Sequence, residues 1–251
     1  MTFTFQTFQQ AQKDGRLTDF LWDFIQQHKS SPQVAGKTGA AAADLYDRQK
    51  NPGAEQFAAA YADMLKKLSN NTRRDVVRPD MVKSNLFRRL NKQRAAYSLG
   101  NGVTFADDEA AKEKLGPTFD EQVFKAGYFA LIHGESFGLW NFDHLDVFKL
   151  TELAPLYDED TSVLRAAVRF WQLNPDTPIR VVLYEEDGYT EYKSQERGTQ
   201  PLQESAAKRG YKKTAVTTTV GGEEEVTEEN YGTLPIVPLW GSDLHQSTLV
   251  G

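Results

Sequence analysis

The sequence predicts an α+β fold in which helices come first and an antiparallel β-meander follows. Two observations separate the halves: apolar residues recur at helical spacing through much of the first 130 residues, and from Ser136 onward they alternate with polar residues. A third is the dipeptide Asp187-Gly188 between two alternating segments, which is a strong local signal for a tight hairpin turn.

The first half contains several segments with helical patterning. Apolar residues at positions 17, 20, 21, 24 and 25 predict a helix that ends near Ser31-Pro32. An alanine-rich stretch over 40–48 predicts another, and apolar residues on one face predict a third over about 54–68.

A basic helix is expected over about 81–99. Gly100 suits a left-handed cap at its end. Its predicted apolar stripe consists of Val82, Leu86, Phe87, Leu90 and Tyr97.

A short strand, a small helix and a longer helix are predicted next. The strand is expected at 103–105 and the small acidic helix at 107–115. Thr118 and Glu121 have the spacing of a capping box and predict a helix that ends at His133-Gly134.

The second half is predicted to consist of short strands. Residues 195–210 are polar and are predicted to form an exposed loop, and Gly221-Gly222 begins a turn that closes the strand before it. The predicted strands are 137–141, 145–150, 153–157, 163–173, 179–186, 189–194 and 211–220. We expect two parts, an N-terminal helical arm over 1–79 and an α+β domain over 80–251.

Bulk properties exclude several classes of protein. A net charge of −6 argues against a general nucleic-acid binder, and the absence of cysteine excludes disulfides, thiolate metal sites and cysteine nucleophiles. None of the four histidines has a short metal-ligand spacing to another. The N-terminus has no export signal and no apolar run approaches the roughly 20 residues of a membrane span, so a soluble protein made in the cytoplasm is expected.

Three motifs could be read as catalytic or metal sites. Gly36-Lys37-Thr38 resembles the end of a phosphate-binding loop, but Ser31 replaces the first glycine and a helix is predicted before it. His133 to Ser136 could belong to a hydrolase, but Ser136 follows a helix, so we expect His133 to interact with free carbonyls at the helix end. Asp158-Glu159-Asp160 is typical of a β-turn.

A basic segment is the strongest candidate for function. Ten Lys or Arg residues and only two acids lie between Lys66 and Arg94. Such a segment either is a solvated helix face or meets a polyanion or an acidic neighbouring subunit. Glu185 to Asp187, Glu191 and the segment 223–229 supply an acidic face in the same chain, which favours head-to-tail contacts between copies. The candidate subunit-interface or DNA-proximal residues are Lys83, Arg88, Arg89, Lys92 and Arg94.

Several segments, taken in order, resemble the portal proteins of tailed bacteriophages. The first is Ser84-Asn-Leu-Phe through Tyr97-Ser-Leu-Gly-Asn-Gly-Val-Thr-Phe105, which resembles the helix and strand of the portal wing domain. The others are 126–138, 143–148, 155–159, 164–171, 182–192 and Leu234-Pro-Ile-Val-Pro-Leu-Trp240. The resemblance covers roughly residues 80–251, so the second expected part is a portal wing-like domain.

The resemblance implies a structural protein without enzymatic activity and without a cofactor. Portal proteins form a ring, typically of twelve copies, at one capsid vertex, through which double-stranded DNA is packaged and ejected. Their partners are terminase, scaffold and major capsid proteins and the head–tail connectors. Location in the virion is implied, with assembly in the host cytoplasm.

Portal proteins continue past the region of Trp240 into stem, clip and crown, so we expect this chain to be a truncated or prophage-derived copy. Two other functions stay open: a nucleotide-binding enzyme that uses Gly36-Lys37-Thr38, and a minor capsid or head-completion protein.

Overall fold

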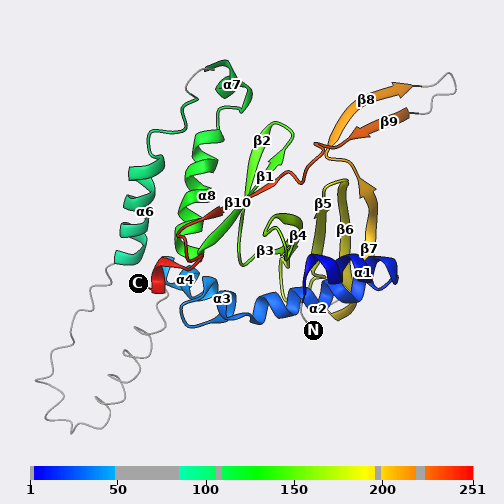
Figure 1. Ribbon diagram of the computed structural model, residues 1–251, viewed down its shortest axis with the longest axis horizontal. Coiled ribbons are helices and arrows are strands. Elements are labelled where there is room, and N and C mark those ends of the chain that lie inside the picture. The colour runs from blue at the N-terminus through cyan, green and yellow to red at the C-terminus, as the bar shows by residue number, and fades with distance from the viewer. Residues whose placement is uncertain (1–2, 49–84, 106–108, 196–198, 219–223, 251) are drawn as a thin grey trace, which may run out of the picture.

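A computed structural model describes residues 3–48, 85–105, 109–195, 199–218 and 224–250, and it confirms the α+β fold (Figure 1). The helices are α1 (Phe5–Lys13), α2 (Leu17–Ser30), α3 (Pro32–Ala35), α4 (Ala40–Asp47), α6 (Leu86–Leu99), α7 (Glu109–Lys114), α8 (Phe119–His133) and the 3-10 helix η3 (Thr248–Val250). The strands are β1 (Glu135–Asn141), β2 (His144–Lys149), β3 (Leu153–Tyr157), β4 (Leu164–Trp171), β5 (Arg180–Glu185), β6 (Gly188–Gln195), β7 (Thr199–Arg209), β8 (Lys212–Thr218), β9 (Glu224–Glu229) and β10 (Ile236–Trp240).

The central element is a five-stranded antiparallel meander of order β3-β4-β5-β6-β7. The predicted hairpin at Asp187-Gly188 joins β5 to β6, with Glu185 paired to Gly188. Gly188 has a φ of +140°, and a β carbon there would overlap the carbonyl of Arg209, so the turn favours glycine.

Helices α1 and α2 cover one face of this sheet (Figure 1). The spacing that predicted α2 corresponds to its buried face, since Phe20, Leu21, Phe24 and Ile25 are all buried against the sheet. Helix α1, which was not predicted, adds Phe8 to the same cluster. Its N-cap residue is Thr4, whose hydroxyl accepts a hydrogen bond from the Thr7 amide.

The helices before residue 48 therefore share a core with strands that follow residue 153. The strand residues of this core include Leu156, Val168, Val181 and Leu183. The predicted boundary at residue 79 lies outside the described residues and stays a prediction, as does the helix over 54–68.

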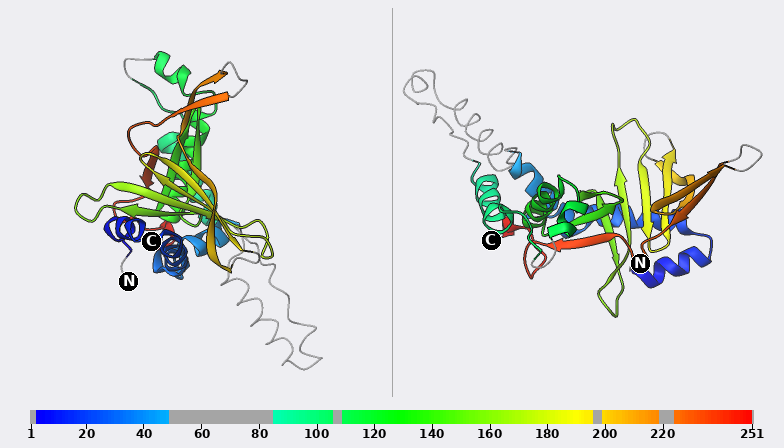
Figure 2. Two further views of the ribbon diagram at one scale, coloured as in Figure 1. Left: turned by 90° about the vertical axis from the view of Figure 1, so that its right-hand side faces the viewer. Right: turned by 90° about the horizontal axis from the view of Figure 1, so that it is seen from above.

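A second, three-stranded sheet of order β10-β1-β2 packs against part of the opposite face of the meander. Phe137 and Phe148 of the small sheet lie in one cluster with Ala167, Val182 and Tyr184 of the meander. Helix α8 lies along β1 and β2, and α6 packs on α8 (Figures 1 and 2).

Helix α8 ends where the sequence predicted, at His133. Gly134 follows it with a φ of +88°, and a β carbon there would overlap the backbone of residues 245–246. The helix end is therefore packed tightly against the C-terminal segment.

Strands β8 and β9 form a separate two-stranded ribbon that projects from the meander (Figures 1 and 2). Its strand β9 contains Glu224 and Glu225, which were expected in the turn, and the rest of that predicted turn, 221–223, lies outside the described residues.

Several local predictions were wrong. Residues 199–209 form strand β7 instead of a loop, and residues 103–105 form no strand. Gly100 has a φ of −67°, whereas Gly102 takes the left-handed conformation at +75° and its amide donates to the Leu99 carbonyl. The Thr118 side chain makes no capping hydrogen bond. No helix in the described ranges is both long and apolar enough to span a membrane.

The shared core predicts that truncation of an α2 side chain destabilises the whole fold. Ile25 is fully buried, and we expect Ile25→Ala to lower the free energy of unfolding by about 3 kcal/mol because it leaves a cavity. Urea unfolding followed by circular dichroism measures this. Gln26→Ala, at an exposed neighbouring position, is the control and should change stability by less than about 0.5 kcal/mol. Equal stability of the two variants would contradict the shared core.

Candidate interaction surface on helix α6

Helix α6 carries four of the five predicted site residues, and it packs on α8 through a narrow face. Asn91 and Ala95 are buried, and Phe87 packs against Tyr128, Leu131 and Ile132. Gly127 of α8 lets the helices approach, because a β carbon there would overlap the side chain of Leu99.

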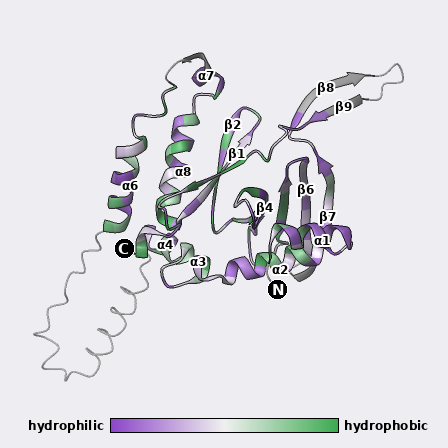
Figure 3. Cartoon of the chain, in the orientation of Figure 1, coloured by the Kyte–Doolittle hydropathy of each residue, from purple (hydrophilic) through white to green (hydrophobic). Residues whose placement is uncertain are grey.

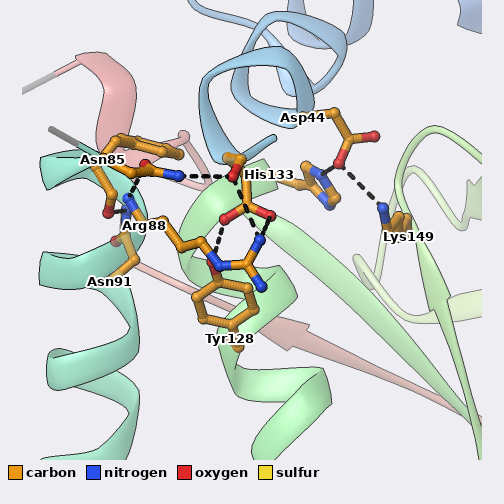
Figure 4. A network of polar contacts seen from close by, with 9 residues as sticks. Asp44, Asn85, Arg88, Asn91, Tyr128, His133 and Lys149 are labelled. Carbon is orange, nitrogen blue, oxygen red and sulfur yellow. Dashed lines mark hydrogen bonds and ion pairs between the residues drawn. The ribbon is translucent and has the colours of Figure 1, made fainter. Parts of the chain in front are cut away.

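Polar contacts fix the N-terminus of α6 (Figure 4). Asn85 is its N-cap residue: its side-chain oxygen accepts from the Arg88 amide at 3.1 Å, and its amide group donates to the Asp47 carbonyl at 3.0 Å. The Asp47 carboxylate accepts a hydrogen bond from the Tyr128 hydroxyl and lies 3.8 Å from an Arg88 nitrogen. Burial, followed by the hydrogen bond to Asp47, raises the pKa of Tyr128, so the hydroxyl stays protonated as the donor.

Asn91 makes a second polar connection in the middle of α6. Its amide group donates to the Phe87 carbonyl at 3.0 Å, and its oxygen accepts from the Thr248 hydroxyl at 2.9 Å. These bonds satisfy a buried polar side chain and tie α6 to the C-terminal segment.

Asp44, three residues before Asp47, connects α4 to α8 and β2 (Figure 4). One of its carboxylate oxygens lies 3.0 Å from Nε2 of His133 and 3.0 Å from Nζ of Lys149. Burial alone would raise the pKa of Asp44, but the hydrogen bond and attraction to His133, with Lys149, outweigh it and lower the pKa to about 2. His133 thus binds a carboxylate, so the prediction that it caps helix carbonyls was wrong.

The opposite face of α6 is open to solvent. At 100° per residue, Leu86, Leu90 and Tyr97 align within one narrow stripe, and their exposed fractions are 57%, 62% and 83%. Arg89 and Arg94 flank this stripe on its two sides, and Figure 3 shows the resulting alternation of hydrophobic and hydrophilic residues along α6. We call these five residues the α6 outer face.

The predicted apolar stripe is therefore divided. Only Phe87 of its described members packs inward, because the face that meets α8 is built from Phe87, Asn91 and Ala95. Val82 lies outside the described residues.

The structure separates the predicted site residues into two groups. Arg88 belongs to the contacts that anchor α6, whereas Arg89, Lys92 and Arg94 are exposed and form no ion pair with another described residue. Lys83 lies outside the described residues. Asp44, Asp47 and Tyr128 were not among the predicted site residues. The one local signal was the spacing of the two aspartates, which places them on one face of α4.

The predicted acidic face lies at the other end of the molecule, near the β5–β6 turn and the β8–β9 ribbon (Figure 1). It is partly neutralised, since Lys208 pairs with both Glu185 and Asp187, while Glu186 is exposed.

The surroundings of the three remaining motifs indicate structural roles. Gly36-Lys37-Thr38 lies between helices α3 and α4, without the preceding strand that a phosphate-binding loop needs. The Ser136 hydroxyl is buried and donates to the Ala126 carbonyl at 2.7 Å. Asp158 accepts from the amides of Asp160 and Thr161, which confirms a turn.

A cavity of about 760 Å³ lies between the end of α2, the start of β1 and the C-terminal segment. Burial raises the pKa of Glu135 in its wall, although hydrogen bonds from the Tyr157 hydroxyl and the Trp240 indole oppose that effect. Trp240 in turn stacks on His245 with ring centroids 4.8 Å apart. No helix or strand period in the sequence indicates this cluster, because it joins the separate strands β1, β3 and β10.

The chain matches no model of a known protein family, and no curated protein sequence matches it. The resemblance to portal proteins accordingly stays a prediction.

The low pKa of Asp44 predicts a pH-dependent contribution to stability. Because folding lowers this pKa from 3.8 to about 2, the ionised carboxylate stabilises the fold above about pH 4 and loses this effect as the pH falls toward 2. We expect Asp44→Asn to lower the free energy of unfolding by roughly 1–2 kcal/mol at neutral pH and by less at pH 3. Urea unfolding at a series of pH values measures this, with exposed Asp23→Asn as the control. A difference that does not change with pH would exclude this role of Asp44.

Proposed function

We propose that this chain is a structural protein that assembles into a ring, as the wing portion of a tailed-phage portal. In this function the ring forms at a capsid vertex, double-stranded DNA passes through it, and terminase and head–tail connectors dock on it. The chain performs no catalysis of its own. The proposal begins from the ordered resemblance over residues 80–251, whose segments correspond in order to α6, α8 and the strands β1 to β6 and β10.

The α6 outer face is the observation that carries the assembly part of the proposal. Two leucines and a tyrosine are more than half exposed on a helix whose other face is firmly anchored. Full burial of each such side chain lowers the free energy by about 1.5–3 kcal/mol, so a neighbouring surface that covers them would favour association. Arg89 and Arg94 at the margins restrict that neighbour to one with exposed acids.

The positions of the charged surfaces favour a head-to-tail contact between copies. Helix α6 lies toward one end of the long axis, and strands β5 and β6 with their acidic turn lie toward the other end (Figure 1). A contact between two different surfaces propagates from copy to copy, and it closes into a ring when the rotation between copies permits.

Oligomeric state provides the test. We expect the wild-type chain to form a high oligomer in native mass spectrometry and closed rings in negative-stain images, and the double variant Leu90→Ser/Tyr97→Ser to be monomeric. Leu173→Ser is the matched control, because Leu173 is 73% exposed and lies on the β4–β5 connection, away from α6. It should assemble like the wild type.

A second variant tests the charges. Arg89→Glu/Arg94→Glu should weaken assembly without affecting folding, since neither residue pairs with another described residue, whereas Arg88 would be a poor choice because it anchors α6. A wild-type monomer at every concentration, or an oligomer indifferent to all these changes, would refute the proposal.

A further inference from the structure

The five-stranded sheet has a second cationic surface, on the face opposite α1 and α2. The strand register places Trp171, Arg180 and Lys193 in one row across β4, β5 and β6, because each is paired directly with the next. Arg209 of β7 lies in another row of the same face, paired with Tyr189. Trp171, Arg180, Lys193 and Arg209 all line one groove of about 570 Å³.

The pair Arg180 and Lys193 is unfavourable for the sheet itself. Directly opposed residues of antiparallel strands have Cα atoms about 4.5–5.5 Å apart, and like charges there destabilise the pairing. Both side chains are exposed, and neither forms an ion pair or side-chain hydrogen bond with another described residue. The same is true of Arg209. Three cations thus line the groove without an anionic partner among the residues that the structure describes.

The other residues of the groove suit a ligand with both anionic and apolar parts. Among the described residues that line the groove, Glu191 is the one acid. Trp171 has one ring face covered by the guanidinium of Arg169, 4.6 Å from the ring centroid, which fixes the indole in place. Leu173, at the rim, is 73% exposed.

The spacing of the three cations indicates a polymeric ligand. Lys193 and Tyr189, the pairing partner of Arg209, are four residues apart on β6, which is about 13 Å at roughly 3.3 Å per residue. A single phosphate group cannot contact both ends of such a groove, whereas successive phosphates of one strand can. Arginine is well suited to these contacts because its planar guanidinium can donate hydrogen bonds to two oxygens of one phosphate at once.

We infer that this groove binds the phosphate backbone of a nucleic-acid strand through Arg180, Lys193 and Arg209. The inference does not depend on ring formation, since all three residues belong to one copy. Because the whole chain carries a net charge of −6, binding depends on this local surface and weakens steeply as salt increases.

The test is fluorescence anisotropy of the full chain with a labelled single-stranded DNA of roughly 16 nucleotides, and with its duplex, at about 50 and 200 mM salt. The variant Arg180→Ala/Lys193→Ala/Arg209→Ala is compared with Lys13→Ala/Arg16→Ala/Lys114→Ala, which removes the same charge at exposed positions outside both the groove and helix α6. We expect the groove variant to raise the Kd about tenfold or more and to lower the slope of log Kd against log salt concentration by about two to three. The control variant should change the Kd by less than about twofold. Circular dichroism and thermal unfolding establish that each variant folds, and Lys193→Gln alone, expected to weaken binding severalfold, serves if the triple variant does not fold.

Three results would overturn the inference. They are no binding of either DNA at low salt, an equal loss of affinity in the two triple variants, and displacement of the DNA by inorganic pyrophosphate at the concentration of the DNA itself. The last result would show that the groove binds small phosphate compounds. Failure of assembly with intact DNA binding would refute only the proposed ring.

Discussion

The position of helix α6 depends on two carboxylates of the short helix α4. The Asp47 carboxylate accepts a hydrogen bond from the Tyr128 hydroxyl and lies near the Arg88 guanidinium, and the Asp47 carbonyl accepts one from the Asn85 amide group. The Asp44 carboxylate contacts His133 and Lys149. A buried or half-buried charge without such partners would be strongly destabilising, so the five groups constrain one another. The direction in which the α6 outer face points follows from this cluster.

The rest of the fold packs around the five-stranded sheet, and part of one face of this sheet is left uncovered. Helices α1 and α2 cover one face, and the small sheet covers the part of the other around Ala167 and Tyr184. The row of Arg180 and Lys193 lies beyond that cover and is exposed. Both interaction surfaces inferred from the structure therefore lie where internal packing stops.

The sequence predicts elements whose burial follows a local period. The apolar spacing of α2 and the alternation in β6 correspond to single buried faces, whereas the apolar runs of β4 and β5 are buried on both faces of the sheet. All of these elements were located within a few residues. Strand β7 was missed because it lies at the edge of the meander. Over residues 201–209, whose burial is described, Leu202 is its one residue in the core cluster beneath α1 and α2. Edge strands tolerate polar sequences, so their pattern resembles that of a loop.

The candidate site was less predictable than the fold. Which face of α6 is buried depends on α8, and α8 selects Asn91 and Ala95 over Leu90 and Tyr97. Asp47 meets Tyr128 across 81 residues of chain, a distance over which no helix or strand period carries information. The basic character of α6 was visible in the sequence, whereas the separation of Arg88 from its exposed neighbours required the tertiary contacts.

Strand β10 pairs with β1 although Trp240 follows Glu135 by 105 residues. During synthesis at about 5–20 residues per second, β1 therefore waits roughly 5–20 seconds before its neighbour emerges. Throughout that interval the amide and carbonyl groups on one side of β1 have no strand to pair with, and they offer a template for pairing with another chain. Closure of the small sheet is thus a late event in the folding of this protein, and nascent chains are vulnerable to misassembly until it occurs.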